Sequence, residues 1–471
     1  MPPALTTQAL RACVSTGRTG LLQPRRLTDE LRELLSRALA DVPRIHARAA
    51  LRAEDRWWSG AASRPLRELV QQSFRTRQLL RSTVHEGTWR NAQSYIGFPD
   101  PADARWSTHE YERAELLASP GSAPGRAPAW TAGQPCCVLP AASGMSAITG
   151  WLWGLGRVAA QRGEEVLLLT NELYYETAHL LRVAAPPGLR VSVHADADDL
   201  LARVNRPDGP IAVLVDSTYP GGSAAAIGRV LAEADPALTV CVAWDSTCVA
   251  LDEGPQLRED HRHLPLVVLR SHPKLDQLGL ELCSFGSVTV VGATGRDDAP
   301  RDPGSHLWFA ISTVMEVAGL FAPGYSVRLL AQLGLPDPRL AAAGNASLRA
   351  ANARVAGALA DALEHRVEYQ VRAPEHRCFV NLHLLAHPPD RCPELKHDIA
   401  AVEALAEEHR IPAWRSDSFG FHYTSLSAYP VRDRAGEPDH TILRIGVGMH
   451  DEDVADRLVT ILATRLLGRL R

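Results

Sequence analysis

Lysine is nearly absent from this sequence, and one of its lysines occupies a position where a primary amine could react. The chain has 50 lysine and arginine residues, but only two of them, Lys274 and Lys396, are lysine. Lys274 follows the apolar segment 267–269 in a polar turn. A primary amine can lose its proton and form a Schiff base, whereas a guanidinium cannot. The pattern indicates amine chemistry at Lys274, and a chance lysine on a surface turn is the alternative.

Two charged residues stand in or directly after apolar segments that we expect to be buried strands. Asp245 follows the segment 239–244, so its carboxylate needs a partner. It either caps a helix or pairs with a protonated ring nitrogen of a cofactor. Arg444 lies within the segment 441–447, where a guanidinium favours a bidentate anion, which is either a ligand or an internal ion-pair partner.

Two uncharged motifs also follow expected strands. The turn 143–146 separates the strand 136–139 from a helix at 145–160. Backbone N–H groups at such a helix start can bind a phosphate, although its glycine could serve only to turn the chain. Tyr174 follows the strand 165–170, where its ring could stack on a flat cofactor or lie in an ordinary interface.

Alternating strands and helices must position these residues. We expect strands at 136–139, 165–170, 190–194, 211–215, 239–244, 265–270 and 285–292, with helices at 145–160, after 171–177, at 197–204 and at 224–234. Strands that are apolar throughout and alternate with helices predict a mostly parallel sheet covered on both faces. Ligands of such sheets bind at the carboxyl ends of the strands, where the singled-out residues lie.

The chain is long enough for more than one domain. We expect a helical N-terminal extension over 1–90, a major α/β domain over 91–337 and a smaller C-terminal α/β domain over 338–471. The smaller domain would begin with a long helix, roughly 338–365. We further expect mainly helix from 305 to about 334, a helix at 397–409, a loop at 416–430 and a terminal helix at 451–468.

Composition excludes several classes of function. The net charge of −4 gives no basic excess for binding nucleic acid or an anionic membrane surface. No apolar run approaches the roughly 20 residues of a membrane helix. The eight cysteines are scattered without a C-x-x-C pair, which favours reduced thiols in the cytoplasm. None of the histidines has a metal-ligand spacing, so we expect no metal site.

The order of the motifs resembles that of fold-type I enzymes that use pyridoxal 5′-phosphate (PLP). Within them the chain resembles the Cys/Met metabolism group, the cystathionine γ-synthase and γ-lyase relatives. The matching segments are Ser143–Ile148, Leu173–Thr177, Asp245–Thr247, Ser271–Lys274 and Leu443–Asp451. The last is the most specific, because chains of this group end with a similar strand and an acidic helix start. The resemblance covers about 108–471 and leaves out 1–90.

The resemblance implies a role for each matching residue around the cofactor ring. Lys274 would hold PLP as a Schiff base, and Asp245 would pair with the pyridine nitrogen. Tyr174 would stack on the ring. Thr247 and Tyr219 would make further cofactor contacts.

The resemblance also implies phosphate and substrate contacts. Backbone N–H groups of Gly144 and Met145 would bind the phosphate with the help of Ser143 and Ser271. Arg444 would bind the substrate α-carboxylate, with Ser418 as a further substrate contact.

Three positions depart from the pattern of the group. Tyr95-Ile96-Gly97 lacks the arginine of a Tyr-x-Arg pair that reaches a neighbouring subunit's phosphate. Tyr219 stands where the group has asparagine, and Pro273 stands where it has a hydroxyl residue. These departures favour a specialised relative that keeps PLP.

We therefore expect a PLP-dependent enzyme that catalyses γ- or β-replacement or elimination on an activated amino acid. An aminotransferase stays open because the scaffold is shared, and so does a non-catalytic binding module. The resemblance further implies a homodimer or homotetramer, with an amino acid as the small-molecule substrate.

Overall fold

A computed structural model describes residues 129–466 of the chain. The gaps are at 132–133, 195–196, 206, 219–221, 258–263, 278, 280–282, 294–301, 323–325, 328–329, 331–337, 375–377, 410, 412, 417, 421–422, 433–437 and 449–451. The described residues fall into two compact units, one at 129–276 with 283–338 and the other at 339–466 with 277–282. The extension predicted at 1–90 and Tyr219 lie outside the described residues.

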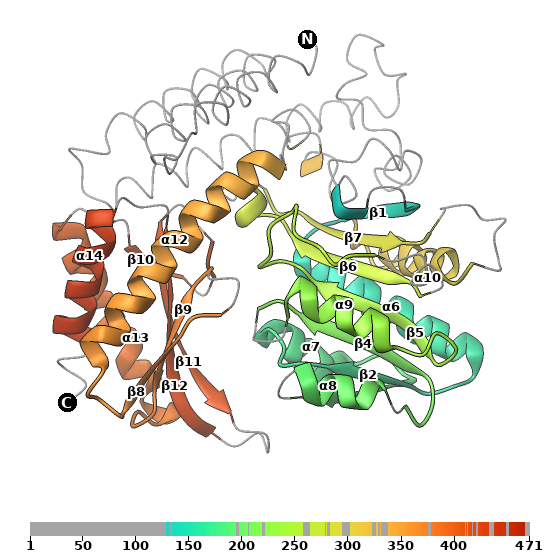
Figure 1. Ribbon diagram of the computed structural model, residues 1–471, viewed down its shortest axis with the longest axis horizontal. Helices are drawn as coiled ribbons and strands as arrows, with labels where there is room; N and C mark the ends of the chain where they lie inside the picture. Colours follow the sequence, from blue (N-terminus) through green and yellow to red (C-terminus); the bar gives the residue numbers. More distant parts are fainter. Residues whose placement is uncertain are drawn as a thin grey trace, which may run out of the picture. The chain divides into compact units, whose positions relative to one another are not determined.

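The first unit is built on a seven-stranded sheet with the order β1-β7-β6-β5-β4-β2-β3 (Figure 1). Its strands are β1 (Cys136–Ala141), β2 (Val166–Thr170), β3 (Leu189–Val193), β4 (Ile211–Asp216), β5 (Thr239–Asp245), β6 (Leu266–Ser271) and β7 (Gly286–Val291). Strands β3, β2, β4, β5 and β6 pair in parallel, and β7 is antiparallel to both of its neighbours. The predicted seven-stranded, mostly parallel sheet is confirmed.

Helices cover both faces of this sheet, as Figure 1 shows. They are α6 (Gly144–Arg162), α7 (Tyr175–Ala184), α8 (Ala197–Val204), α9 (Ala224–Glu233) and α10 (Pro303–Val317), with short 3-10 turns η3 (Ala129–Thr131) and η5 (Leu275–Gln277). In β4, Leu214 packs in the core under α6 and α10, while Val213 and Val215 pack in the core under α8 and α9. Because both faces are buried, the strands are apolar throughout.

The second unit holds a five-stranded sheet with the order β10-β11-β12-β9-β8. Its elements are α12 (Pro338–Leu363), β8 (Tyr369–Arg372), β9 (Val380–Leu384), η6 (Pro389–Arg391), α13 (Cys392–Glu408), β10 (Ala413–Arg415), β11 (Thr424–Arg432), β12 (Pro438–Gly446), α14 (Glu452–Ile461) and a π-helical end, η7 (Leu462–Leu466). Its core joins the helices to one face of the sheet. Two α/β units, one with the larger sheet, agree with the fold-type I architecture expected from the sequence.

The stretch expected to be mainly helix from 305 to about 334 is helical as far as Val317 and, among the described residues, again at 326, 327 and 330. Between these helical parts, Phe321 forms an antiparallel bridge with Ala141. Gly319 has φ +66°, the left-handed conformation that ends helices.

The loop expected at 416–430 contains most of strand β11. Leu426 and Ala428 face the helical core, while Ser425 and Ser427 are buried outside that core cluster. Small alternating side chains gave the segment a loop-like composition, although their period of two is that of a strand.

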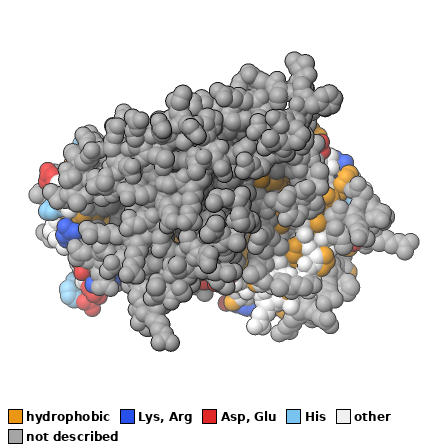
Figure 2. Space-filling view, turned by 90° about the horizontal axis from the view of Figure 1, so that it is seen from above, with side chains coloured by type: hydrophobic (Ala, Val, Ile, Leu, Met, Phe, Trp, Pro, Cys, Tyr) orange, Lys and Arg blue, Asp and Glu red, His pale blue; other side chains and the backbone are white. Residues whose placement is uncertain are grey.

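None of the described helices is both long and apolar enough to cross a bilayer. On the face drawn in Figure 2, acidic and basic side chains of the described residues both occur and are interspersed with uncharged ones.

Candidate functional site

Parallel pairing brings several polar residues to one edge of the first sheet. Asp245 ends β5, and its Cα partner across the ladder is Asp216, the last residue of β4. Ser271 ends β6, the neighbour of β5 on the other side. The carboxyl ends of these strands therefore form one polar edge, where ligands of such sheets bind.

Asp245 is buried, with 7% of its surface exposed. Its Oδ1 accepts hydrogen bonds from Thr247 N at 3.0 Å and from Thr247 Oγ1 at 2.6 Å. Burial raises the pKa of Asp245, and these hydrogen bonds and the charges of Lys274 and Arg270 act in the opposite direction. Among the described residues both hydrogen bonds go to Oδ1, so Oδ2 can face a cationic partner.

Lys274 lies in the turn between β6 and η5 and is half-buried. Its Nζ lies 5.7 Å from the centroid of the Tyr174 ring. Tyr174 directly precedes α7, and its backbone N–H donates to Asp216 Oδ2 at 2.7 Å. The amine and the aromatic ring predicted to flank a cofactor are thus close together.

The start of α6 lies against the end of β6. A Cβ at Gly144 would lie 2.6 Å from Ser271 Cβ, so no larger residue fits this close approach. Ser143 caps the helix, because its Oγ accepts from Ser146 N at 3.0 Å. The N–H groups of this 19-residue helix carry partial positive charge, which suits an anion beside Ser271.

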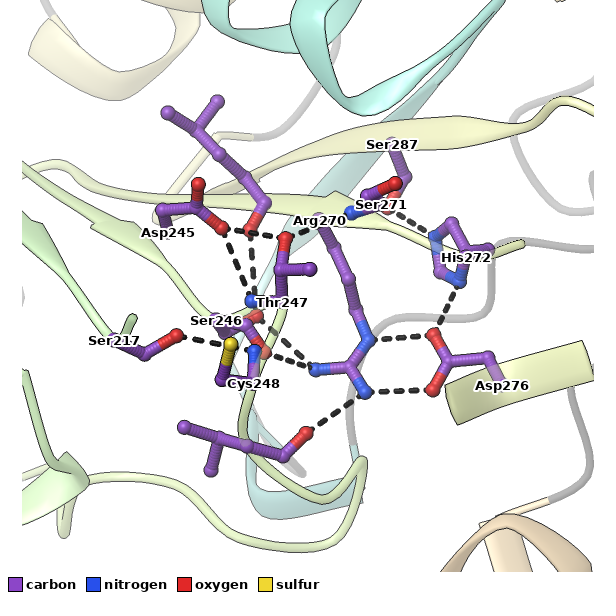
Figure 3. Close-up of polar contacts among 12 residues, drawn as sticks. Ser217, Asp245, Ser246, Thr247, Cys248, Arg270, Ser271, His272, Asp276 and Ser287 are labelled. Carbon is purple, nitrogen blue, oxygen red and sulfur yellow. Dashed lines mark hydrogen bonds and ion pairs between the residues drawn. The ribbon is translucent and has the colours of Figure 1, made fainter. Parts of the chain in front are cut away.

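Hydrogen bonds join the end of β6 to the turn after β5, and the start of α6 to α7. Ser271 N donates to Thr247 Oγ1 at 3.1 Å, and Thr247 bonds in turn to Asp245 (Figure 3). Thr177 Oγ1 in α7 donates to Met145 Sδ at 3.9 Å. The first unit thus brings together eight of the residues that the sequence predicted: Ser143, Gly144, Met145, Tyr174, Asp245, Thr247, Ser271 and Lys274.

Sequence reasoning did not select Asp216 as a site residue. Its Oδ1 accepts from Thr218 N at 2.7 Å, and its Oδ2 accepts from Tyr174 N. Burial, and then the charge of Asp245, raise the pKa of Asp216 to about 7. The signal was present, since Asp216 ends an apolar strand in the same way as Asp245.

Asn171 was also missed. Its Nδ2 donates to Asp216 O at 3.0 Å, and Asp216 N donates to Asn171 Oδ1 at 2.8 Å. The amide thus continues the β2–β4 ladder after β2 has ended, and it ties the turn that carries Tyr174 to Asp216. No local pattern in the sequence marks this role.

Arg444 and Ser418 belong to the second compact unit. The buried guanidinium of Arg444 lies 4.3 Å from the ring centroid of Phe379 and 4.9 Å from that of Tyr429, and its Nε donates to Asn381 Oδ1 at 3.4 Å. Ser418 is partly buried and precedes Phe419, whose ring centroid lies 5.8 Å from the same guanidinium. These contacts hold the guanidinium in one orientation.

The described residues contain no cluster of three or more His, Cys, Asp or Glu side chains that could hold a metal ion. No family model matches the sequence, and no curated protein does.

Two solved structures resemble the fold. The crystal structure of MetB from Corynebacterium glutamicum has 15% identity and a TM-score of 0.47 over 72% of this chain and 83% of that chain. The structure of apo CalE6, a methionine gamma lyase from Micromonospora echinospora, has 18% identity and a TM-score of 0.45 over 70% of this chain and 81% of that chain.

Neutralising Asp216 should change how stability depends on pH. The folded chain holds the Asp216 proton to about pH 7, whereas the ordinary carboxyl loses it near 3.8. The unfolded chain therefore binds fewer protons at this residue between these values, and the contribution of Asp216 to stability falls with rising pH by up to about 1.4 kcal/mol per pH unit. Asp216→Asn should lack this slope in urea unfolding series.

The matched control is Asp252→Asn, which neutralises an exposed carboxylate in the same unit. Its unfolding free energy should run parallel to that of the wild type at every pH. Parallel curves for Asp216→Asn as well would contradict a raised pKa at this residue.

Proposed function

We propose that this chain is a PLP-dependent enzyme that catalyses γ- or β-replacement or elimination on an activated amino acid. One observation carries the proposal: the Lys274 amine lies 5.7 Å from the Tyr174 ring centroid, at the sheet edge where Asp245 is buried. This cluster occupies the carboxyl end of a mostly parallel sheet, where such cofactors bind.

The residues present fit the parts of PLP. The aldehyde suits the amine of Lys274, and the pyridine nitrogen suits the buried carboxylate of Asp245, which gains from a cationic partner. The phosphate suits the N-terminus of α6, where the close contact of Gly144 with Ser271 leaves backbone N–H groups beside a hydroxyl. Tyr174 supplies a ring for stacking.

When bound, PLP supplies an electron sink for negative charge at the substrate Cα. Asp245 would pair with the ring nitrogen and keep it protonated. Burial raises the pKa of Asp245, and the hydrogen bonds of Thr247 and the charges of Lys274 and Arg270 oppose that rise. Asp216 can stay neutral beside it, which avoids two adjacent buried charges. Lys274, once displaced by the substrate amine, would remove the Cα proton and, for chemistry at Cγ, a Cβ proton.

The first test is whether Lys274 binds the cofactor. Wild-type protein incubated with PLP and reduced with borohydride should carry a stable adduct on the peptide that contains Lys274, seen by mass spectrometry. Lys274→Ala should lose the adduct and the turnover, since Lys396 is the only other lysine in the sequence. Lys396→Ala, which removes the exposed lysine of α13, should keep both.

An adduct at Lys396 in the wild type, or no adduct and no colour with added PLP, would contradict the proposal. The latter result would favour the non-catalytic binding module.

Isotope exchange distinguishes replacement and elimination from transamination. With an unreactive amino acid in heavy water, deuterium should enter at Cα and then at Cβ, because chemistry at Cγ requires both protons to be removed. NMR of the recovered amino acid measures both sites. Exchange confined to Cα, with a keto acid accumulating, would assign the chain as an aminotransferase instead.

We also propose, from the sequence resemblance, that Arg444 binds the substrate α-carboxylate and that Ser418 contributes to substrate binding. Arg444→Lys keeps the charge but loses the bidentate fork, which should cost about 1.5–3 kcal/mol, or roughly ten- to a hundredfold in the apparent KM for amino acids. Decarboxylated amines with the same side chain should bind as before. Equal losses for acids and amines would show that Arg444 serves only the packing of Phe379 and Tyr429 around it.

Three further features are proposed with the function. We propose that the chain consists of an extension at 1–90, a major domain at 91–337 and a smaller domain at 338–471. We also propose that it acts as a homodimer or homotetramer, and sedimentation of the PLP-loaded protein measures this oligomeric state. A cytoplasmic location is supported by the seven described cysteines, all of which are free thiols. Cell fractionation tests it.

A further inference from the structure

Arg270 is a buried cation that the proposed reaction does not use directly. It is the penultimate residue of β6, precedes Lys274 by four positions and has 4% of its surface exposed. Burying an arginine is costly unless its charge and hydrogen-bond donors find partners. The partners of the Arg270 guanidinium are Asp276, Ser246 and Val249.

Five hydrogen bonds fix the guanidinium, and the longest runs from Nη1 to Ser246 Oγ at 3.3 Å (Figure 3). Nε donates to Asp276 Oδ2 and Nη2 donates to Asp276 Oδ1, both at 2.6 Å. Nη1 donates to the carbonyl of Ser246 at 2.6 Å, and Nη2 donates to the carbonyl of Val249 at 2.9 Å. The planar fork thus binds one carboxylate and two carbonyls at once, which an ammonium group cannot do in this geometry.

These partners belong to the two segments that carry the proposed chemistry. Asp276 is the last residue of the turn 271–276. Lys274 therefore lies, in sequence, between Arg270 and Asp276, the two members of the ion pair. Ser246 and Val249 belong to the turn that directly follows Asp245. One guanidinium therefore joins the turn of Lys274 to the turn of Asp245.

His272 supports the same turn from its other side. Its Nδ1 lies 2.6 Å from Asp276 Oδ2, and its Nε2 forms a 2.8 Å hydrogen bond with Ser287 Oγ in β7. Although burial acts to raise it, the pKa of Asp276 is lowered to about 2 by Arg270 and then His272. The ionised carboxylate thus ties the turn to β7 as well as to Arg270.

We propose that Arg270, through Asp276, is a positioning residue that holds the amine of Lys274 in place relative to Asp245. The inference rests on the proposed function for its chemistry, but the tether itself is a property of the chain without cofactor. A buried ion pair adds little net stability to a fold, because desolvation of the two charges offsets their attraction. We therefore assign the Arg270–Asp276 pair a role in positioning rather than in stability.

The test compares Arg270→Lys and Asp276→Asn with the wild type. The matched control is Arg203→Lys, which alters a surface arginine that bonds Asp208 at the same 2.6 Å. Because misplacement of the amine slows bond formation, both test variants should form the borohydride-stable adduct at Lys274 about ten- to a hundredfold more slowly. Their equilibrium affinity for PLP should change less, and turnover should lose kcat with little change in KM. The control should match the wild type throughout.

Hydrogen–deuterium exchange on cofactor-free protein separates this proposal from the proposed function. In both test variants the segments 245–250 and 271–276 should exchange faster together, while β2 and α8 stay protected. Adduct formation at the wild-type rate in folded Arg270→Lys would overturn the proposal, and so would faster exchange in only one segment or uniformly across the unit.

If Arg270→Lys does not fold, Asp276→Asn decides alone, because it keeps the shape of the side chain and one acceptor. If even the wild type forms no adduct, the proposed function fails, and coupled exchange of the two segments still tests the tether.

Discussion

Charged groups are buried at the ends of apolar strands in this protein, and each must find partners that replace water. Asp216 bonds the backbone after β2, Asp245 bonds the turn after β5, and Arg270 binds Asp276. Asp216 therefore connects β4 to the turn after β2, and Arg270 connects β6 to the turn after β5, although these segments are separate in sequence. The positions of Tyr174 and Lys274 depend on these connections, because both lie in turns outside the ladder of the sheet.

The need to satisfy buried charges is greatest at the ends of β4 and β5, where the carboxyl groups of Asp216 and Asp245 are neighbours. Two buried negative charges on paired residues repel each other, so one favours its protonated form. Burial raises the pKa of Asp245, and the hydrogen bonds of Thr247 and the charges of Lys274 and Arg270 oppose that rise. Burial and then the charge of Asp245 raise the pKa of Asp216 to about 7. The same arrangement places the carboxyl of Asp245 at the end of β5 and uses the carboxyl of Asp216 to hold the backbone of Tyr174.

The second unit satisfies a buried charge in a different way. Arg444 lies among the rings of Phe379, Phe419 and Tyr429, with Asn381 as a hydrogen-bond acceptor. Aromatic faces stabilise a guanidinium while keeping its plane fixed. Rigid support of this kind is what a residue proposed to bind a carboxylate requires.

The sequence by itself determined the seven strands, the covered parallel sheet and the candidates Lys274 and Asp245, because apolar periodicity and an isolated lysine are local signals. It did not determine the end of α10 or the strand β11, where a left-handed glycine and small alternating side chains decide the local structure. Only the tertiary structure decided the roles of Asp216, Asn171 and Arg270. Tyr174 and Asp216 are 42 residues apart, and Arg270 and Ser246 are 24 apart. Contacts between distant segments leave no periodic signal, so they follow from strand order and register alone.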